Sequence, residues 1–343
     1  MITEEQMAEF RKLLDESERP MFFFDDDPDG LCSYLLLKKY AKKGRGVAVK
    51  SSPVLGAQYS RKIQEYGPDM VFVLDKPVVE QDFVDEARVP VVWLDHHPPV
   101  HLSGVSYFNP LLNDEKDNRP VSYWCYRITG QNQWIAMAGC IGDWFIPEFA
   151  NDFAKEHPDL LPAVVEQGQM LYDTPMGQLS RILSSILKGS TSDVVSCISA
   201  LEKVREPEEI LNGTTPAGRY VLKYHKKINK VYEKLLHKAM EASGNDDFLV
   251  FTYPMTKMSF SGDLANELLH RLPGKFIIVA RMKSDTAAIS MRSKSHIIPP
   301  MLKLALEGLG GYGGGHDHAC GGSIVVKDFP VLVERLREMA RHN

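Results

Sequence analysis

The sequence predicts an α/β protein: a parallel-sheet N-terminal domain and a smaller α/β C-terminal domain joined by a helical connector. Two observations predict it. Short runs of apolar, β-prone residues alternate with segments of helical periodicity, which is the order typical of parallel sheets. Several of these runs end directly in acidic or imidazole side chains, as strands do at the ligand-binding edge of open α/β sheets. We expect domains over residues 1–150, 151–245 and 246–343.

The composition is that of an ordinary globular protein. The chain has 343 residues, of which 44% are hydrophobic and 25% charged, and its formal net charge is −5. This length indicates two or three domains. A protein that coats nucleic acid non-specifically is usually basic, so we expect any nucleic-acid contact to be a local groove or patch.

The cysteines and the N-terminus indicate the compartment. The five cysteines are scattered and form no CxxC pair, which favours a reducing cytosol over a disulfide framework or a thiolate zinc site. The N-terminus is acidic and shows no basic, apolar leader. No apolar run approaches the ~20 residues that a membrane span needs. We therefore expect a soluble, cytoplasmic protein with no membrane partner.

The first predicted strand, Met-Phe-Phe-Phe at residues 21–24, ends in an acidic turn. The turn reads Asp-Asp-Asp-Pro-Asp-Gly over residues 25–30, and helical spacing resumes after it. Four carboxylates in five residues repel one another unless cations hold them together. A solvated surface turn is the alternative, but such turns rarely follow a buried aromatic strand directly.

Two further apolar runs end in the same way. Residues 70–74 lead into Asp75, and residues 91–94 lead into the triplet at 95–97, Asp-His-His. A carboxylate and neutral imidazoles are good ligands for a divalent metal. The carboxyl ends of parallel strands meet at one edge of a sheet, so these side chains are expected to build a two-metal site.

A segment of small residues at 135–142 brings one more acid, Asp143, to its end. Alone it could be a surface residue. Its weight as a candidate ligand comes from the other acids.

The connector carries the longest helical pattern, from residue 216 to 242, with Pro216 near its start and Gly244 just past its end. Seven basic residues occupy its other faces: Arg219, Lys223, Lys226, Lys227, Lys230, Lys234 and Lys238. A solvated helix surface is one interpretation. A phosphate-attracting wall above an active cleft is the other.

The C-terminal domain is expected to contain strands at residues 248–251, 276–280 and 287–293, the last of which carries Arg292. A glycine-rich run follows at residues 308–322. Glycines let backbone N–H groups approach phosphate oxygens closely. We expect a ligand-binding loop rather than a flexible linker, because His-Asp-His and a new apolar run follow.

These motifs together resemble the DHH phosphoesterase family, which includes RecJ-type exonucleases, nanoRNases and cyclic-dinucleotide phosphodiesterases. The triplet at 95–97 matches the motif that names the family, and the turn at 25–30 is similar to its first motif, D-x-D-x-D-G. Asp75 and Asp143 stand where the second and fourth motifs place an aspartate.

The resemblance continues into the C-terminal domain, so that it spans residues 21 to 330. Residues 313–321 are similar to the G-G-G-H-x-x-A-A-G signature of the associated C-terminal domain, and residues 290–293 match its S-x-R-S strand. Cys320 replaces a usual alanine. Many members have a histidine at the start of the first motif, where this chain has Asp25, or Met21 under another alignment. RecJ-type enzymes also use an aspartate there, so activity is expected to survive.

The resemblance implies two manganese ions on the N-terminal domain, with magnesium or cobalt as alternatives. The expected metal ligands are Asp25, Asp27, Asp75, His96 and Asp143, with Asp75 bridging the ions. Asp75 is also expected to be catalytic, together with His97, which would contact the scissile phosphate, and with Asp29, as an added ligand or a supporting acid. The expected substrate-binding residues are Arg292, Gly313, Gly314, Gly315 and His316.

The resemblance also implies hydrolysis of phosphate esters by a water that two metals activate. The two-domain core and mild acidity favour an exonuclease or nanoRNase that releases mononucleotides from short single-stranded RNA or DNA. The enzymatic alternatives are a 3′,5′-bisphosphate phosphatase, a pyrophosphatase and a cyclic or linear dinucleotide phosphodiesterase. A non-catalytic replication or repair scaffold is disfavoured, because such proteins lose metal ligands. A homo-oligomer and a replication or repair partner stay open.

Overall fold

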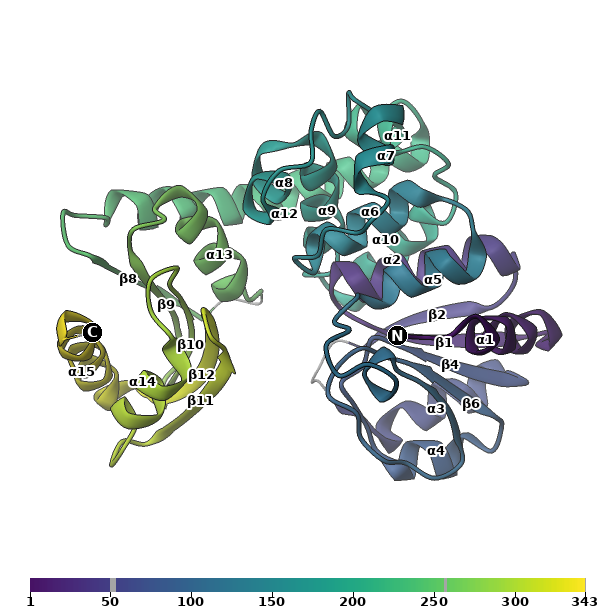
Figure 1. Ribbon diagram of the computed structural model, residues 1–343, viewed down its shortest axis with the longest axis horizontal. Helices are drawn as coiled ribbons and strands as arrows, with labels where there is room; N and C mark the ends of the chain where they lie inside the picture. The colour runs from purple at the N-terminus through teal and green to yellow at the C-terminus, as the bar shows by residue number, and fades with distance from the viewer. Residues whose placement is uncertain (50–53, 256–257, 343) are drawn as a thin grey trace. The chain divides into compact units, whose positions relative to one another are not determined.

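The computed structural model describes residues 1–49, 54–255 and 258–342 (Figure 1). The chain divides into two compact units, Met1–His225 and Lys226–Asn343. The helical segment after residue 150 therefore belongs, up to His225, to the first unit. The expected domain boundaries near residues 150 and 245 stay predictions. Among the described residues, no helix combines the length and the apolar character needed to cross a bilayer.

The first unit contains a five-stranded sheet in the order β2-β1-β4-β6-β7, and every pairing in it is parallel. Its strands are β1 Pro20–Asp25, β2 Arg45–Val49, β4 Met70–Leu74, β6 Val91–Leu94 and β7 Val105–Phe108. The predicted parallel sheet is confirmed, and β7 is a strand that the sequence analysis did not identify. A separate two-stranded parallel sheet pairs β3 (Val54–Leu55) with β5 (Val78–Val79).

The central strands are buried on both faces, which is why they read as unbroken apolar runs. On one face, Phe23 and Trp93 pack with residues of the two helices that follow β2 and β4. On the other face, the Phe24 ring stacks on Tyr34 with centroids 4.7 Å apart, and Phe72 contacts Phe10 at 5.6 Å. The sheet is therefore a rigid platform covered on both sides.

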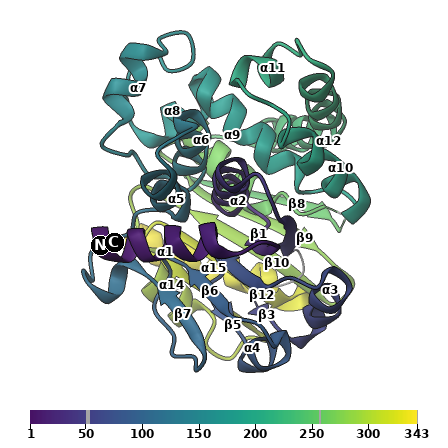
Figure 2. The same ribbon diagram turned by 90° about the vertical axis from the view of Figure 1, so that its right-hand side faces the viewer.

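Helices cover this platform on both faces, as Figures 1 and 2 show, with α2 and α5 on one face and α3 and α4 on the other. The helices of the first unit before residue 150 are α1 Glu4–Glu16, α2 Pro28–Ala41, α3 Ser60–Tyr66, α4 Gln81–Ala87, α5 Val121–Thr129 and α6 Gln133–Gly142. Helix α2 starts at Pro28, within the acidic turn of residues 25–30, so the turn joins a buried strand directly to a buried helix.

The segment after residue 150 is helical, as predicted. It comprises α7 Ala150–Glu156, α8 Gln167–Asp173, α9 Pro175–Ile186, α10 Thr191–Leu201, α11 Pro207–Leu211 and α12 Pro216–Glu241. Helix α12 is the long helix expected from residue 216 to 242, and proline stands at its first position, where the missing N–H costs nothing.

The second unit contains a mixed five-stranded sheet in the order β11-β12-β10-β9-β8. Its strands are β8 Phe248–Pro254, β9 Phe276–Met282, β10 Thr286–Arg292, β11 Gly311–His316 and β12 Ala319–Val325. Only β8 and β9 pair in parallel. Helices α13 Ser261–Arg271, α14 Ile298–Ala305 and α15 Phe329–His342 complete the unit, with Leu302, Leu332 and Leu336 in its core.

The glycine-rich run at residues 308–322 forms most of two paired strands, β11 and β12, rather than the expected loop. Residues 311–316 form β11, which pairs antiparallel with β12 in register from Gly311↔Ile324 to His316↔Ala319. All six residues of β11 are exposed. Glycine is rare in strands, which is why the sequence favoured a loop. Here the partner strand carries Gly321 and Gly322 opposite Gly314 and Gly313, so two nearly bare backbones pair closely.

Candidate metal centre

The candidate site lies where three neighbouring strands, β1, β4 and β6, reach their carboxyl ends. Asp25 is the last residue of β1, Asp75 follows β4, and the triplet at 95–97 follows β6. Strands β1 and β6 flank β4 in the sheet. Parallel pairing therefore delivers these side chains to one edge, as the strand ends predicted.

The acidic turn between β1 and α2 is held by backbone contacts. Asp27 is the N-cap of α2, and its Oδ1 accepts a hydrogen bond from the Gly30 N–H at 2.9 Å. A Cβ at Gly30 would lie 2.7 Å from both the backbone N and O of Asp25, so only glycine fits there. The glycine of the motif thus lets α2 start directly against the end of β1.

Asp29 is buried and is committed to the start of another helix. Its Oδ2 and Oδ1 accept the backbone N–H groups of Val121 and Ser122, both at 2.8 Å. These are the first residues of α5, where N–H groups lack helical partners and the helix dipole favours an anion. Asp29 therefore fixes α5 to the acidic turn, and its role as catalytic acid or added ligand stays a prediction.

Asp25 forms an ion pair with a lysine that the sequence analysis did not single out. Lys76 Nζ lies 2.7 Å from Asp25 Oδ1, and the lysine side chain is fully buried. Trp93 Nε1 donates to the Lys76 carbonyl at 3.1 Å and holds its backbone. The position of Lys76, directly after the aspartate that follows β4, could have indicated this role. A lysine after a strand usually indicates a solvated turn, however.

Asp75 is buried in an unusual backbone conformation. Its φ is 58°, in the left-handed region that aspartate and asparagine tolerate better than most residues. Among the described residues, its Oδ1 accepts no hydrogen bond although it is buried. A buried carboxylate oxygen without a hydrogen bond is costly, and a bound cation would satisfy it.

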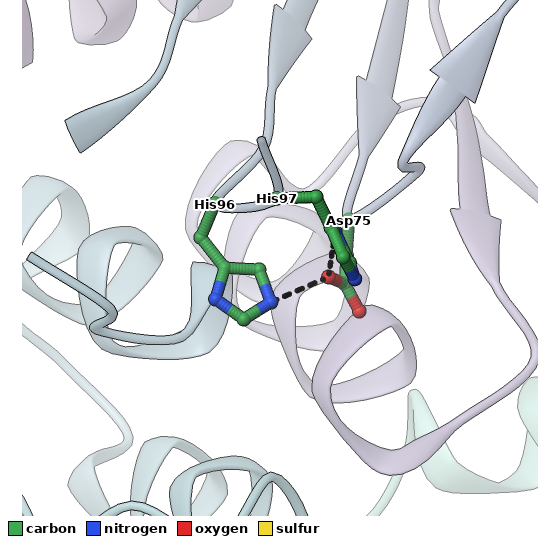
Figure 3. Close-up of side chains that lie close together, drawn as sticks. All are labelled: Asp75, His96 and His97. Atoms are coloured by element: carbon green, nitrogen blue, oxygen red, sulfur yellow. Dashed lines mark ion pairs between the residues drawn. The ribbon is translucent and has the colours of Figure 1, made fainter. Parts of the chain in front are cut away.

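Both histidines direct a ring nitrogen toward the same carboxylate oxygen of Asp75 (Figure 3). His96 Nε2 lies 3.4 Å from Asp75 Oδ1 and 3.8 Å from Asp143 Oδ2. His97 Nδ1 lies 3.9 Å from Asp75 Oδ1 but only 2.9 Å from Asp95 Oδ1. His96 is thus the histidine that links Asp75 and Asp143.

Asp95 orients His97. It is fully buried, and in addition to the ring contact its Oδ2 accepts the His97 backbone N–H at 3.0 Å. Asn109, also fully buried, donates to the His97 carbonyl at 2.9 Å. This holds the loop after β6 and leaves Nε2 as the ring nitrogen of His97 that can face a ligand.

Asp143 reaches the cluster from the end of α6. It is the C-cap of that helix, and the next residue, Trp144, has a φ of 57° that ends the helix abruptly. A Cβ at Gly142 would lie 2.6 Å from the Pro28 Cβ, so glycine permits the close approach of α6 to the start of α2. The glycine before Asp143 therefore lets the end of α6 lie close to the acidic turn.

The carboxylates interact strongly. Burial, followed by the charges of Asp25 and Asp29, raises the pKa of Asp27 to about 7. Burial and neighbouring aspartates likewise raise the pKa values of Asp75 and Asp143 well above the usual range. The interior resists this much negative charge unless protons or cations are present.

The histidine pKa values move in opposite directions. Burial lowers the pKa of His96, which keeps its imidazole neutral and able to bind a metal. Burial also acts to lower the pKa of His97, but the hydrogen bond and charge of Asp95 outweigh it, so the net shift is upward.

The donor set fits divalent cations. One ligand atom each from Asp75, His96 and His97 lies within 4.8 Å of the others, and the same holds for Asp29, His96 and Asp143. Asp27 belongs to the same cluster, because its charge helps to raise the pKa of Asp75. Carboxylate oxygens and imidazole suit manganese and other transition metals. Asp25 is also a predicted ligand, but its Oδ1 forms an ion pair with Lys76.

The second unit brings its predicted substrate-binding residues to one end of its sheet. Arg292 on β10 and His316 on β11 are both in register with Ala319 of the intervening strand β12. Residues in direct register share a face, so both side chains lie on the same face, about 10 Å apart. Gly313, Gly314 and Gly315 precede His316 on the exposed edge strand.

Arg292 is fixed by contacts that the sequence did not reveal. Its Nε donates to Asn266 Oδ1 of α13 at 2.5 Å, and its Nη1 donates to the Met291 carbonyl at 2.8 Å. A guanidinium held in this way is prepared for an anion.

A family model and several solved structures resemble this chain. Residues 245–342 match the DHHA1 domain. No protein of curated function matches the sequence significantly. Among solved structures, RecJ from Thermus thermophilus in complex with Mn²⁺ has 18% identity and a TM-score of 0.59. The match covers 98% of this chain and 55% of that chain, so this chain spans about half the length of that RecJ.

Two further structures match over nearly their whole lengths. The DHH domain of a protein described as a member of a family of ribosomal proteins has 14% identity and a TM-score of 0.66, covering 98% of this chain and 89% of that one. The pGpG-specific phosphodiesterase PggH from Vibrio cholerae has 13% identity and a TM-score of 0.52, covering 95% and 99%. At these identities the likeness establishes a shared fold.

Without divalent metal, the protein should lose thermal stability as the pH rises. Folded Asp27 keeps its proton up to a pKa of about 7, whereas the unfolded chain releases it near pH 4. Its stabilisation is therefore complete below about pH 4 and lost as the pH rises through about 7. The opposite shifts of His96 and His97 partly cancel. Melting in EDTA between pH 4.5 and 7.5 measures this loss.

Manganese at pH 7.5 should restore the melting temperature by about 3 °C or more, because cations relieve the repulsion. The Asp27→Asn variant is the control and should show a weaker pH dependence in EDTA. A melting temperature that is independent of both pH and manganese would contradict a buried carboxylate cluster.

Replacing the buried lysine should destabilise the first unit. Lys76→Met keeps the apolar volume but leaves Asp25 without its counter-charge. Because the Asp25 side chain is 23% exposed, we expect a loss of about 2 kcal/mol in unfolding free energy, less than for a fully buried pair. Urea unfolding measures it, with the exposed Lys62→Met as control.

The double variant Lys76→Met with Asp25→Asn should recover part of this loss, since it removes the uncompensated charge. A Lys76→Met protein as stable as the Lys62→Met protein would show that the ion pair contributes nothing.

Proposed function

We propose that this chain is a member of the DHH phosphoesterase family and a metal-dependent phosphoesterase that acts on nucleic acids or nucleotides. The match of residues 245–342 to the DHHA1 domain and the fold shared with RecJ support this proposal. The observation that carries the proposal is the convergence of Asp75, His96 and Asp143 from three separate segments. A scaffold without catalytic function would have no need for buried acids that raise one another's pKa values.

We propose two manganese ions as the cofactor, with magnesium or cobalt as alternatives. The ligands would be Asp25, Asp27, Asp75, His96 and Asp143, with Asp75 between the two ions. Bound there, the cations would supply a water of lowered pKa and neutralise charge on the phosphate. The buried Oδ1 of Asp75, which accepts no hydrogen bond among the described residues, and the neutral imidazole of His96 support this assignment.

His97 would act on the substrate. Asp95 holds its Nδ1 and raises its pKa, which favours the protonated imidazole. A protonated ring can donate a hydrogen bond from Nε2 to a phosphate oxygen or give a proton to the leaving oxygen. Asp29 would act indirectly, by fixing α5 and the acidic turn around the ligands.

The second unit would bind the substrate. Arg292 presents a fixed guanidinium, which suits bidentate contact with phosphate. His316 lies at the same end of the sheet, and Gly313, Gly314 and Gly315 expose backbone N–H groups of an edge strand. The guanidinium, the imidazole and the backbone N–H groups would contact phosphates without distinguishing one base from another.

The substrates we propose are short single-stranded RNA or DNA, hydrolysed to mononucleotides. The RecJ likeness supports this choice, since a second matched structure is described as exonuclease RecJ bound to manganese. The second candidate is a linear or cyclic dinucleotide, favoured by the match over 99% of the pGpG-specific phosphodiesterase. A 3′,5′-bisphosphate is a further alternative. The five buried, free cysteines are consistent with the cytoplasm as the proposed location.

Incubation with end-labelled RNA and DNA of two to about twenty-four nucleotides, and with cyclic dinucleotides, tests the function. In manganese we expect a ladder of products ending in mononucleotides, and none in EDTA. Hydrolysis restricted to dinucleotides would select the second candidate. No hydrolysis of any substrate in manganese would favour a scaffold.

Asp75→Asn should lower kcat by about 10³-fold or more, because it removes the central carboxylate. Asparagine tolerates the left-handed φ of 58° at this position, where alanine would add strain. The fold should persist, as circular dichroism would show. The exposed Asp159→Asn is the matched control and should keep full activity. Activity of Asp75→Asn near that of the control would refute the two-metal assignment.

Arg292→Ala should raise KM about 10-fold and change kcat little, because this residue is proposed to bind the substrate's phosphate in the ground state as well as the transition state. Steady-state kinetics on a short oligonucleotide measure both constants, with the exposed Arg341→Ala as control. Equal losses in kcat and kcat/KM would instead indicate a contact made only in the transition state.

A further inference from the structure

Helix α12 presents an exposed stripe of cations, here called the basic stripe. Its members are Arg219, Lys223, Lys226, Lys227, Lys230, Lys234 and Lys238, and all seven are exposed. At 3.6 residues per turn they fall within a sector of about 120° around the helix axis. Basic residues scattered at random would surround the helix. The spacing therefore defines one charged face.

The opposite face of α12 is packed, which fixes the direction of the basic stripe. Val221 and Ala239 are fully buried, and Tyr224, Ile228 and Leu236 are at most 8% exposed. A helix anchored along one face cannot rotate, so the stripe faces solvent along its length.

Positive charge is concentrated on α12, although the chain as a whole is acidic. Helix α12 contains seven basic and two acidic residues, a net charge of +5, whereas the whole chain has −5. The remainder of the chain therefore carries −10. Within the described ranges, no carboxylate forms an ion pair with Lys223, Lys226, Lys230, Lys234 or Lys238, so these charges are not balanced internally.

An exposed aromatic ring lies at the edge of the stripe. Tyr220 is 45% exposed, whereas Val221 and Tyr224 of the same helix are buried. It precedes Lys223 by three residues, which places the two on adjoining parts of the helix surface. An aromatic ring beside a row of cations is the arrangement with which proteins stack a base while holding the phosphates of a single strand.

We propose that the basic stripe of α12 binds the sugar-phosphate backbone of single-stranded nucleic acid, with Tyr220 stacking on a base. The inference rests on the proposed function for its substrate class and extends it, because the stripe is about 28 Å long from Arg219 to Lys238. Cations four residues apart are separated by ~6 Å along the axis, which is comparable to the spacing of phosphates in an extended strand.

The chemistry of the stripe favours nucleic acid over other polyanions. Six of its seven members are lysines, which act as point charges and contact phosphates without sequence preference. Membrane binding would need an apolar face to enter the bilayer, and that face of α12 is packed against protein. Binding should therefore be independent of base sequence, sensitive to salt, and stronger for strands long enough to span the stripe.

The test is binding in EDTA, where hydrolysis is off, using the full chain and fluorescent oligothymidylates of 3, 6, 12 and 24 nucleotides. The stripe variant is Lys223→Gln, Lys230→Gln, Lys234→Gln and Lys238→Gln. The control variant makes the same charge change at four other exposed lysines: Lys62, Lys116, Lys203 and Lys303.

For the 24-nucleotide strand we expect the stripe variant to bind at least ~10-fold more weakly. The slope of the logarithm of the binding constant against the logarithm of the salt concentration should fall in magnitude by about 3. The control should bind within about 2-fold of the wild type. Lysine-to-arginine changes at the same four positions should preserve binding, and Tyr220→Ala should weaken it by several-fold. Equal melting temperatures would show that all variants are folded.

Equal binding of wild type and stripe variant would overturn the inference, as would tighter binding of a polyglutamate peptide or of phosphatidylserine vesicles than of the oligonucleotide. These results are separable from the proposed function. If the wild type hydrolyses oligonucleotides but the stripe variant binds them unchanged, only the stripe inference falls. If no substrate is hydrolysed but the stripe variant binds weakly, only the hydrolytic function falls.

Discussion

Repulsion among buried carboxylates at the carboxyl edge of the parallel sheet is the constraint on which the first unit depends. Asp27, Asp75 and Asp143 have raised pKa values because burial and neighbouring acids act on all three. The fold provides compensating partners for two other acids of the acidic turn. Lys76 neutralises Asp25, and the N-terminus of α5 receives Asp29. Each of these contacts balances the negative charge of one aspartate in the acidic turn. What stays uncompensated is the centre, around Asp75, where a cation would be held most strongly.

Much of this arrangement could be predicted from the sequence, because strand ends are visible in it. An unbroken apolar run followed by an acid, as at Leu74 and Asp75, indicates both a doubly covered strand and the edge at which that strand stops. Three such runs are enough to define a parallel sheet, and they also place their acids together. The long helix α12 was predictable for a similar reason, since its apolar period and its proline start are local features.

The parts that could not be predicted depend on contacts between distant segments. Lys76 looks like a turn residue until the fold buries it beside Asp25, 51 residues away in sequence. Asp29 looks like one more ligand until α5 arrives with two unpaired N–H groups. The glycine run looks like a loop because strand propensity belongs to side chains, and β11 is made by pairing with β12 instead. In each case tertiary context overrides the local pattern.

The bare edge strand β11 has a consequence for selectivity. At glycines 313, 314 and 315 the exposed edge offers only peptide groups, and peptide groups cannot distinguish a purine from a pyrimidine. A ligand that docks there is read by the shape and charge of its backbone. Discrimination between nucleobases would therefore have to come from side chains outside the three glycines, such as the exposed ring of Tyr312.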